Sequence, residues 1–230
     1  MARCRPGAAG LLATHSYGRD PLIDPLIDLW QHERLARAAG YLMIAGVDEV
    51  GRGPLAGPVV AACVILPEGF DLSGINDSKK LTEKQRERAE IRIRAEAQAI
   101  GLGIVSPEII DRINILQATR EAMRIAFRQL SPTPDYVLID GLPVPDFPCL
   151  VQKSIISGDS QSVSIAAASI VAKVARDQMM RDYAVLYPEY GFAGHKGYGA
   201  ATHMAALREF GPCPIHRRSF APVAASCRTP

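Results

Sequence analysis

The chain has few cysteines, and their arrangement excludes two kinds of site. The five cysteines are odd in number and widely scattered, and no Cys-x-x-Cys pair occurs among them. Neither a structural zinc site nor a framework of disulfides is therefore indicated. We expect reduced thiols in a cytoplasmic protein.

Long apolar runs and a strong charge imbalance are also missing. No run reaches the roughly 18 apolar residues that a membrane-spanning helix needs. The segment around Arg3 and Arg5 is too short and too rich in small residues for a secretory signal. The formal net charge of +2 is too small to indicate a nucleic-acid partner by itself. Basic residues are concentrated between His195 and Arg218, which is either a solvated face or a ligand-binding surface.

What the chain does have is enough apolar sequence for one substantial domain. It contains 230 residues, of which 48% are hydrophobic and 22% charged, so it can bury a core. Residues 1–40 are interpreted as an N-terminal extension, partly flexible, with a short helix at about 29–39. Residues 41–223 form the predicted catalytic domain, and residues 224–230 are interpreted as a tail without a core pattern.

The body of the chain alternates between strand and helix signals. Strands are predicted at 41–47, 58–66, 101–105, 136–140 and 149–155, and helices at 82–100, 106–130, 164–187 and 200–210. The connection between the first two strands is short and rich in glycine, which is typical of a hairpin. Early strands in a meander, followed by alternating helices and strands, predict an α/β fold with a central mixed sheet flanked by helices. The last helix belongs to a C-terminal helical portion.

Acidic residues fall where predicted strands end. Asp48 and Glu49 end the first strand, Asp140 ends "YVLID", and Asp159 lies between a strand and a helix. Such carboxylates could meet at one edge of the sheet, where α/β proteins bind ligands. Alternatively, Asp159 is a helix cap and Asp140 a turn residue. That alternative fits Asp48 and Glu49 poorly, because Gly-Arg-Gly-Pro follows them and no helix begins there.

A cluster of four carboxylates would need neutralisation. At about 4 Å and an effective dielectric constant near 20, each pair of like charges costs about 4 kcal/mol. Either some acids are protonated or divalent cations lie among them. Oxygen-only ligands favour Mg²⁺ or Mn²⁺ over zinc, and the chemistry that suits them is metal-assisted phosphoryl transfer. Because adjacent strand residues point to opposite faces, a site shared by Asp48 and Glu49 predicts a break in the strand at Glu49–Val50.

The loop after the two acids is a Gly-Arg-Gly. Gly51 and Gly53 would let the backbone approach a substrate closely, because they adopt φ values closed to other residues. No Lys-Ser or Lys-Thr follows at the spacing of a Walker A motif, so a nucleotide-phosphate loop is not indicated.

Several motifs together resemble a known family. They are "GVDEVGRGPLAGPVVAACVIL", "NDSKKLT", "INILQAT", "YVLIDG", "GDSQSVSIAAASIVAKVARD", "YGFAGHKGYGA" and "HRRSF", and in this order they resemble bacterial ribonuclease HII. The resemblance covers about residues 41–223. Ribonuclease HIII, the nearest relative, has a Gly-Thr-Gly loop and an added N-terminal domain, so Arg52 and the short N-terminus favour HII.

The resemblance implies an RNase H-like fold and a metal-dependent endonuclease. The implied activity is cleavage of the RNA strand of RNA–DNA hybrids and incision 5′ of single ribonucleotides in duplex DNA. The ends would be 3′-OH and 5′-phosphate, and the tasks would be ribonucleotide removal and RNA primer removal. It further implies a two-metal site with Mg²⁺ or Mn²⁺, in a monomer that does not bind membranes.

The resemblance also assigns roles to individual residues. The catalytic and metal-binding acids would be Asp48, Glu49, Asp140 and Asp159. Asp177, in "KVARD", is the alternative for the fourth acid, although its place inside a helix beside Arg176 favours an ion pair.

Substrate recognition would come from two loops and a set of basic residues. The glycine loop, Gly51, Arg52 and Gly53, would read the ribose 2′-OH, which distinguishes RNA from DNA. Tyr198, in "HKGYG", would sense the RNA–DNA junction, unless it is merely a surface residue in a glycine-rich loop. The candidate phosphate contacts are Lys79, Lys80, Lys173, Arg176, Lys196 and Arg217.

Two other classes of function fit the same fold. A binding module without catalysis would lack one of the four acids, and all four are present. A phosphotransferase would require a nucleotide-phosphate loop, and the sequence contains none that we recognise.

Overall fold

A five-stranded mixed sheet forms the centre of the protein. The computed structural model describes residues 28–75, 78 and 81–227. The strand order is β3-β2-β1-β4-β5, in which β1 to β3 form an antiparallel meander and β4 and β5 run parallel to β1. The strands are β1 (Ile44–Val50), β2 (Val59–Ile65), β3 (Ala99–Val105), β4 (Tyr136–Asp140) and β5 (Gln152–Ile155). The predicted mixed sheet is therefore present.

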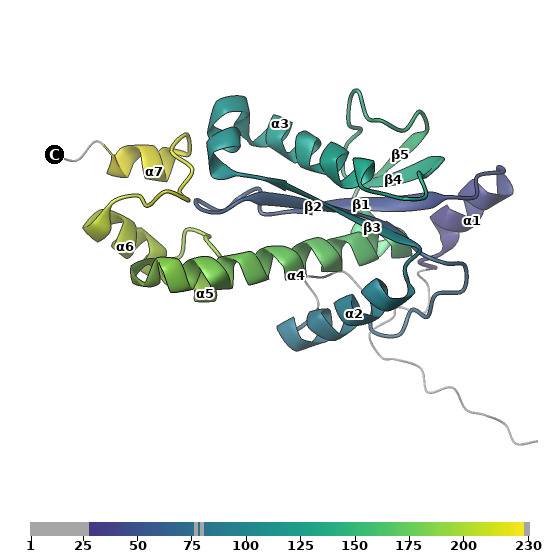
Figure 1. Ribbon diagram of the computed structural model, residues 1–230, viewed down its shortest axis with the longest axis horizontal. Coiled ribbons are helices and arrows are strands. Elements are labelled where there is room, and N and C mark those ends of the chain that lie inside the picture. The colour runs from purple at the N-terminus through teal and green to yellow at the C-terminus, as the bar shows by residue number, and fades with distance from the viewer. Residues whose placement is uncertain (1–27, 76–77, 79–80, 228–230) are drawn as a thin grey trace, which may run out of the picture.

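Helices cover both faces of the sheet (Figure 1). Helix α3 lies on one face, α4 lies on the other, and α2 packs against α4 on that second side. The later helices α5 to α7 gather at the end of the molecule where the chain finishes, and they form the helical C-terminal portion. The helices are α1 (Gln31–Ala38), α2 (Glu83–Glu96), α3 (Pro107–Arg128), α4 (Val163–Leu186), α5 (Phe192–His195), α6 (Ala201–Phe210) and α7 (Ala221–Ser226). Two 3₁₀ turns, η1 (Gly158–Ser160) and η2 (Pro188–Tyr190), flank α4.

The contact between β1 and α4 is unusually close, and it positions the site described below. A Cβ atom on Gly46 of β1 would lie only 2.1 Å from the backbone carbon of Ser164. The first turns of α4 are built from small and apolar residues, including Ala166, Ala167 and Ala168, all fully buried. Small side chains on both surfaces let the helix backbone approach the strand, because no larger group holds them apart.

Local sequence signals specify several of these elements. Thr82 and Gln85 form the predicted capping box of α2, with Thr82 accepting a hydrogen bond from the Gln85 backbone N–H. Ser106 and Pro107 begin α3 as expected. Within α3 the backbone leaves the helical region at Asn114 (φ 64°), whose side chain caps the second part of the helix through Gln117 N–H.

Three predicted features are wrong in this structure. Strand β1 does not break at Glu49–Val50, because its pairing with β2 continues in register to Val50 opposite Val60. Helix α2 ends at Glu96, four residues before the predicted end, because β3 begins at Ala99. The predicted tail at 224–230 starts inside α7, which Val223 anchors by being fully buried.

The described end of the N-terminal extension is part of the folded body. The predicted short helix is present as α1, and its Glu33 is buried against α4. The Glu33 carboxylate accepts hydrogen bonds from Ser162 Oγ (2.5 Å) and from the Ser164 N–H (3.0 Å). Burial raises the pKa of Glu33, while these hydrogen bonds oppose the rise. This carboxylate thus stabilises the start of α4, where backbone N–H groups lack helical partners.

Candidate active site

Two parallel strands bring three acids to one edge of the sheet. The register between β1 and β4 ends at Val47 opposite Ile139, so Asp48 and Asp140 are the next residues along neighbouring strands. Asp48 is almost fully buried, at 5% exposure, and Glu49 follows it on β1. Both residues of β1 extend past the last pair with β4, and β1 stays regular through them: Asp48 hydrogen-bonds Ser169 of α4, whereas Glu49 lines a cleft together with residues of α3.

The acids repel one another in a poorly solvated place. Burial raises the pKa of Asp48 well above its usual range, and the negative charges of Glu49 and Asp140 raise it further. Burial also raises the pKa of Glu49, and the neighbouring Arg52 guanidinium opposes this shift. Arg52 Nη1 lies 3.2 Å from Glu49 Oε1. A positive charge near these carboxylates would therefore be stabilising, and Arg52 provides one next to Glu49.

Two serines on the α4 side of the sheet form a hydrogen-bonded chain that reaches Asp48. Asp48 Oδ1 accepts the Glu49 backbone N–H at 2.7 Å, and the Ser169 hydroxyl on α4 hydrogen-bonds the same side chain. Ser169 Oγ lies 2.8 Å from Ser78 Oγ, and both serines are buried. The sequence analysis missed Ser169 because a serine within an alanine-rich helix gives no functional signal by itself.

Asp159 adjoins the cluster from a different element. It lies in η1, is 2% exposed, and directly follows Gly158, whose N–H donates to Asp140 Oδ1 at 2.7 Å. The N-cap of α4 is Ser162, whose side chain accepts the Ile165 N–H. Asp159 is therefore not the N-cap of α4, and it lies in the 3₁₀ turn that precedes this helix.

The donor set is suited to a hard divalent cation. Asp48, Glu49 and Asp140 offer carboxylate oxygens only, which favour Mg²⁺ or Mn²⁺ over softer ions. Among residues 28–75, 78 and 81–227, no three acidic, histidine or cysteine side chains already stand in a metal-holding arrangement. Glu49 is instead paired with Arg52.

A cleft of about 190 Å³ opens beside the acids. Glu49, Arg52 and Asp140 line one side of it, and α3 supplies Thr119 and Arg120 on the other. Neither Thr119, which ends the motif "INILQAT", nor Arg120 is among the predicted site residues, because their position on a long helix looks like an ordinary solvated face. Their place opposite the acids results from the packing of α3 on the sheet.

A buried arginine holds the glycine loop. Arg217 is 0% exposed, and its guanidinium donates to the carbonyls of Gly57 (2.9 Å), Arg52 (2.9 Å) and Gly51 (2.6 Å). Burial lowers the pKa of Arg217 to about 9, and the charge of Arg176 contributes. Gly51 itself has a φ of +89°, and a Cβ there would lie 2.1 Å from Arg176 Nε, so only glycine fits.

A second buried arginine joins this loop to the loop that carries Tyr198. Arg176 is also 0% exposed, and it donates to Pro58 O (2.9 Å), Ala56 O (3.1 Å) and Lys196 O (3.0 Å). The predicted phosphate contacts of Arg176 and Arg217 are therefore corrected. Neither guanidinium reaches the surface, and the nitrogen atoms of both donate to main-chain carbonyls.

The docking of the two loops places Tyr198 next to the glycine loop. Leu55 N–H donates to Gly197 O at 2.8 Å, and a Cβ on Gly53 would lie 3.7 Å from the Tyr198 ring. The Tyr198 side chain remains 45% exposed. An exposed ring beside the glycine loop, whose Arg52 lines the acidic cleft, is well placed to contact a substrate.

The remaining predicted phosphate contacts have mixed outcomes. Lys173 pairs with Asp177 at 2.7 Å, and Arg86 lies 3.9 Å from the same carboxylate. Asp177 is thus an ion-pair residue, as expected, but its partners are Lys173 and Arg86. Lys196 is half-buried, and its ammonium group donates to Ala193 O. Lys79 and Lys80 lie outside the described residues.

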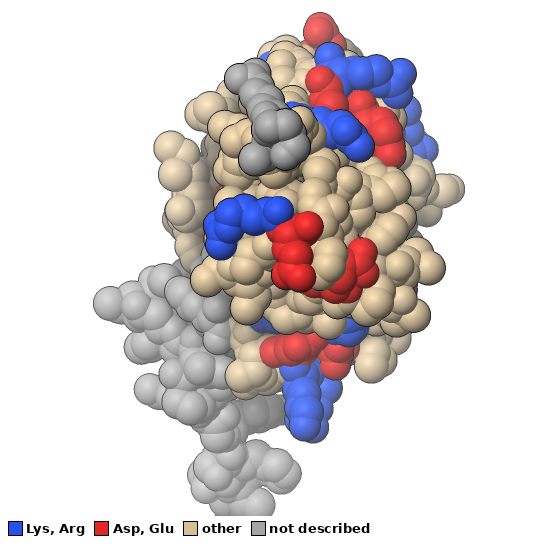
Figure 2. Space-filling model, turned by 90° about the vertical axis from the view of Figure 1, so that its left-hand side faces the viewer, with Lys and Arg blue, Asp and Glu red and all other residues tan. Residues whose placement is uncertain are grey.

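The charge on the face formed by the C-terminal end is mixed. Figure 2 shows Lys and Arg side chains beside Asp and Glu side chains, surrounded mostly by uncharged residues. The basic stretch between His195 and Arg218 thus does not form a continuous positive patch on the described part of this face, and one of its cations, Arg217, is buried.

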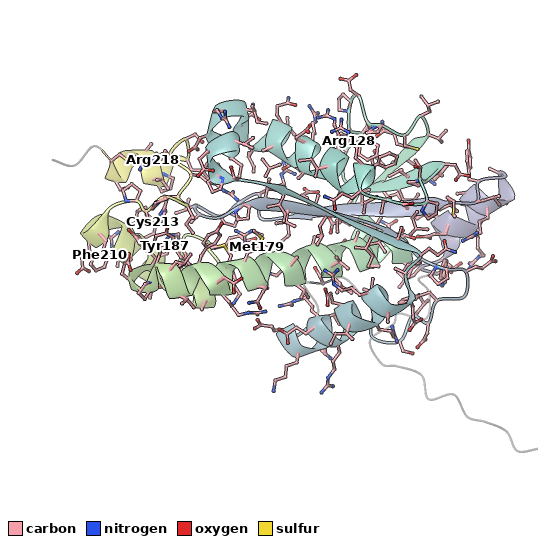
Figure 3. All side chains as sticks on the ribbon, in the orientation of Figure 1. Arg128, Met179, Tyr187, Phe210, Cys213 and Arg218 are labelled. Atoms are coloured by element: carbon pink, nitrogen blue, oxygen red, sulfur yellow. The ribbon has the colours of Figure 1, made fainter. Side chains whose placement is uncertain are left out.

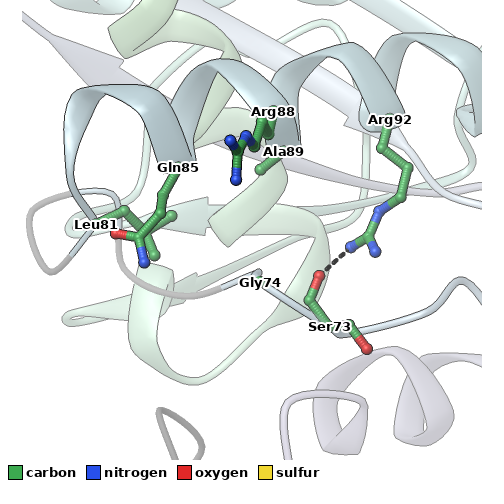
Figure 4. Close-up of a pocket in the computed structure, with 7 residues that line it drawn as sticks. All are labelled: Ser73, Gly74, Leu81, Gln85, Arg88, Ala89 and Arg92. Carbon is green, nitrogen blue, oxygen red and sulfur yellow. Dashed lines mark hydrogen bonds between the residues drawn. The ribbon is translucent and has the colours of Figure 1, made fainter. Parts of the chain in front are cut away.

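A larger hollow of about 320 Å³ lies elsewhere, along α2 (Figure 4). Its Arg92 donates to Ser73 O (2.5 Å) and to Asp71 (3.1 Å), and it lies over the Phe70 ring. The hollow contains none of the predicted site residues. Because its Arg92 is already paired, we do not assign it a role in catalysis.

Comparison with known proteins identifies the family of this chain. The family model for ribonuclease HII matches residues 45–223. The chain belongs to the ribonuclease HII family. The ribonuclease HII of Geobacter sulfurreducens is 57% identical over 198 residues, which cover 86% of this chain and 90% of that protein.

Solved structures show the same fold. The ribonuclease H2 of Pyrococcus horikoshii OT3 is 26% identical, with a TM-score of 0.68 over 80% of this chain and 97% of that chain. Bst-RNase HIII, solved in complex with Mn²⁺, has a TM-score of 0.66 at 19% identity, over 84% of this chain and 71% of that chain.

The predicted RNase H-like fold and the assignment to ribonuclease HII are confirmed. As a member of this family, the protein is an endonuclease that acts on RNA in RNA–DNA hybrids. No helix in the described ranges is both long and apolar enough to cross a membrane.

Asp48→Asn is expected to stabilise the metal-free protein. The amide removes a buried charge that Glu49 and Asp140 repel, and its oxygen can still accept the Glu49 N–H. A gain of about 1 kcal/mol would raise the thermal midpoint by about 2–4 °C in a protein of this size. Differential scanning calorimetry in a chelating buffer at neutral pH measures this. Glu209→Gln, at an exposed position on α6, is the matched control and should change little. A midpoint below that of the wild type would contradict the repulsion.

The variant Arg217→Lys distinguishes two roles of Arg217, a buried clamp on the glycine loop and a phosphate contact at the surface. Lysine keeps the charge but cannot donate to three separated carbonyls in the plane of a guanidinium. We expect the unfolding free energy to fall by at least about 2 kcal/mol, because hydrogen bonds to charged groups contribute about 1.5–3 kcal/mol each. Urea denaturation provides the measurement, and Arg218→Lys at the adjacent exposed position is the control. Equal stability of both variants would show that Arg217 is not a clamp.

Proposed function

We propose that this protein is a divalent-metal-dependent endonuclease with two activities. It cleaves the RNA strand of RNA–DNA hybrids, and it incises 5′ of single ribonucleotides embedded in duplex DNA, leaving 3′-OH and 5′-phosphate ends. It would act in ribonucleotide removal and RNA primer removal, as a cytoplasmic monomer. The observation that carries the proposal is the buried acidic cluster at one sheet edge, beside a clamped glycine loop and an exposed Tyr198.

Asp48, Glu49, Asp140 and Asp159 would hold the metal. The raised pKa of Asp48 supports this, because a cation would relieve the repulsion from Glu49 and Asp140. The structure of Bst-RNase HIII with Mn²⁺ is consistent with the same requirement in a protein of this fold. Bound there, two Mg²⁺ or Mn²⁺ ions would supply an activated water and stabilise the leaving oxygen. The residues of the chain orient this site: Ser169 holds Asp48, and the Gly158 N–H holds Asp140.

Recognition of the ribose would fall to Gly51, Arg52 and Gly53. Arg217 binds the carbonyls of Gly51 and Arg52 from the protein interior, which leaves the N–H groups of the loop outside the clamp. A preorganised backbone donor can bind a 2′-hydroxyl without the loss of entropy that a mobile loop would suffer. Gly53 is exposed, and its lack of a side chain leaves room for close approach to the sugar.

Arg120 is proposed as an additional phosphate contact. It lines the cleft across from Glu49 and Asp140, on a helix that the sheet holds in place. A substrate strand lying in the cleft would bring its phosphates near this cation, which would position the strand without reading its sequence.

A cleavage assay with three duplexes tests the function directly. With Mg²⁺ or Mn²⁺, we expect incision of a duplex with one ribonucleotide and of an RNA–DNA hybrid, while an all-DNA duplex stays intact. Asp140→Asn should lose more than about 100-fold in rate on both substrates, since even outer partners of metal ligands contribute 10–100-fold. Glu209→Gln is again the control. An Asp140→Asn protein with full activity would refute the acid assignment, and cleavage of the all-DNA duplex would refute the specificity.

Tyr198→Ala tests the junction-sensing role. We expect about a 10-fold larger loss on the single-ribonucleotide duplex than on the hybrid, which corresponds to ~1.4 kcal/mol of lost ring contact. The rates of both substrates are compared for the variant and for Tyr198→Phe, which keeps the ring and should retain the preference. Equal losses on the two substrates in Tyr198→Ala would contradict the role.

A further inference from the structure

Two buried histidines lie directly behind Tyr198. His203 on α6 is 0% exposed, and His216, in the segment between α6 and α7, is 2% exposed. Their Nε2 atoms are 3.0 Å apart. The chain continues at both ends: His203 Nδ1 lies 2.8 Å from Tyr198 O, and His216 Nδ1 lies 3.0 Å from the Cys213 backbone N. Figure 3 shows Cys213 at the C-terminal end of the molecule, beside the helices that carry this pair.

The partners at the two ends determine where each proton lies. The Tyr198 carbonyl can only accept, so His203 Nδ1 must carry a hydrogen. The Cys213 backbone N–H can only donate, so His216 Nδ1 must offer a lone pair. With both rings neutral, His216 carries its hydrogen on Nε2 and donates it to His203 Nε2. The result is one directed relay from Cys213 N–H through His216 and His203 to Tyr198 O.

This relay is satisfied only when both rings are neutral. A proton added to His203 would set two N–H groups against each other at the Nε2 pair. A proton added to His216 would take the acceptor from the Cys213 N–H, leaving a buried donor without a partner. A buried donor or acceptor left unsatisfied costs about 1–3 kcal/mol. Acid therefore disrupts the contacts His203–His216 and His216–Cys213 behind Tyr198, whose carbonyl keeps its donors, His203 Nδ1–H and the Ala200 N–H (2.8 Å).

The surroundings favour the neutral forms. The pKa of His216 is lowered to about 4, mainly by burial and also by His203, Arg218 and His195, while the hydrogen bond with Cys213 opposes the shift. Burial and His195 lower the pKa of His203, while its bond to Tyr198 O opposes the shift. His195 on α5 stacks on His203 at 4.5 Å between ring centroids and is itself held by Tyr190 O and Gly197 N.

The other neighbouring groups are neutral or distant. Tyr190 and Phe192 pack their rings on His216, and Phe192 also packs on His203. Burial raises the pKa of the Cys213 thiol to about 11, with a contribution from Glu189, so the thiol beside His216 stays protonated. His203, His216 and Cys213 do not form a metal-binding group in the described part of the chain.

We propose that His203 and His216 are positioning residues for Tyr198, and that their neutral relay holds its backbone in the orientation needed at an RNA–DNA junction. This inference rests on the junction-sensing role of Tyr198 under the proposed function. Protonation of either ring sets two N–H groups against each other within the relay and displaces the rings behind Tyr198, so incision at a single ribonucleotide is lost at acid pH before cleavage of a hybrid. The sign follows from linkage: between about pH 6.5 and 4 the folded protein binds fewer protons than the unfolded chain, so acidification destabilises the relay.

The ratio of the two activities measures the relay, because effects of pH on the acids and the metal act on both substrates. For the wild type, we expect the ratio of single-ribonucleotide incision to hybrid cleavage to be constant above pH 6.5 and to fall about 10-fold toward pH 4.5. His203→Asn, whose amide can still donate to Tyr198 O but does not titrate, should keep a nearly constant ratio. His203→Phe, which lacks the donor, should show the low ratio at every pH. Thermal melts at each pH establish that the variants are folded.

Nitrogen-15 NMR of the histidine side chains reads the relay without any substrate. At pH 7 we expect His203 protonated on Nδ1 and His216 on Nε2, and the opposite tautomer or a charged ring at either position would overturn the relay. If both substrates are cleaved and the ratio responds neither to pH nor to His203→Phe, the positioning role fails while the proposed function stands. If neither substrate is cleaved at any pH with Mg²⁺ or Mn²⁺, the proposed function fails and the positioning role fails with it.

Discussion

The arrangement of the site depends on two guanidinium groups buried without a carboxylate partner in hydrogen-bond contact. Arg176 comes from the sheet-covering helix α4 and Arg217 from the C-terminal segment, and both are fully buried. Their charges are solvated by main-chain carbonyls instead, those of Gly51, Arg52, Ala56, Gly57, Pro58 and Lys196. A buried charge is tolerated only when its donors are satisfied. The loops that carry these carbonyls must therefore keep one conformation. Through them, the two arginines connect the end of the sheet, helix α4 and the C-terminal portion.

The acidic cluster is the electrostatic counterpart of this clamp. On one side of the glycine loop two cations share a buried space, and on the other Asp48, Glu49 and Asp140 repel each other. Arg52, which belongs to the glycine loop, forms an ion pair with Glu49. Both groupings cost folding free energy, which the close packing of β1 on α4 and the apolar cores on both sheet faces offset. Buried like charges that repel one another are typical of sites where function takes precedence over stability.

Much of the fold was predictable from local sequence, whereas the site was predictable only in part. The capping box at Thr82 and the strand "YVLID" depend on neighbours in sequence, so pattern and propensity identify them. The break predicted at Glu49–Val50 was wrong, because β1 pairs with β2 in register as far as Val50 opposite Val60. The roles predicted for Arg176 and Arg217 were wrong, because a composition of basic residues does not reveal which side chains point inward.

The sequence by itself determined the family, the alternation of elements and the positions of the acids at strand ends, because these depend on residue type and spacing along the chain. Only the tertiary structure decided which groups meet. Ser169 and His216 lie within the quoted motifs, but no role for them, for Arg120 or for His203 follows from the sequence, since each acquires its role from a residue on another element. Hydrogen bonds and charge interactions act over a few ångströms in space, and that distance is set by how helices and strands pack, not by their order.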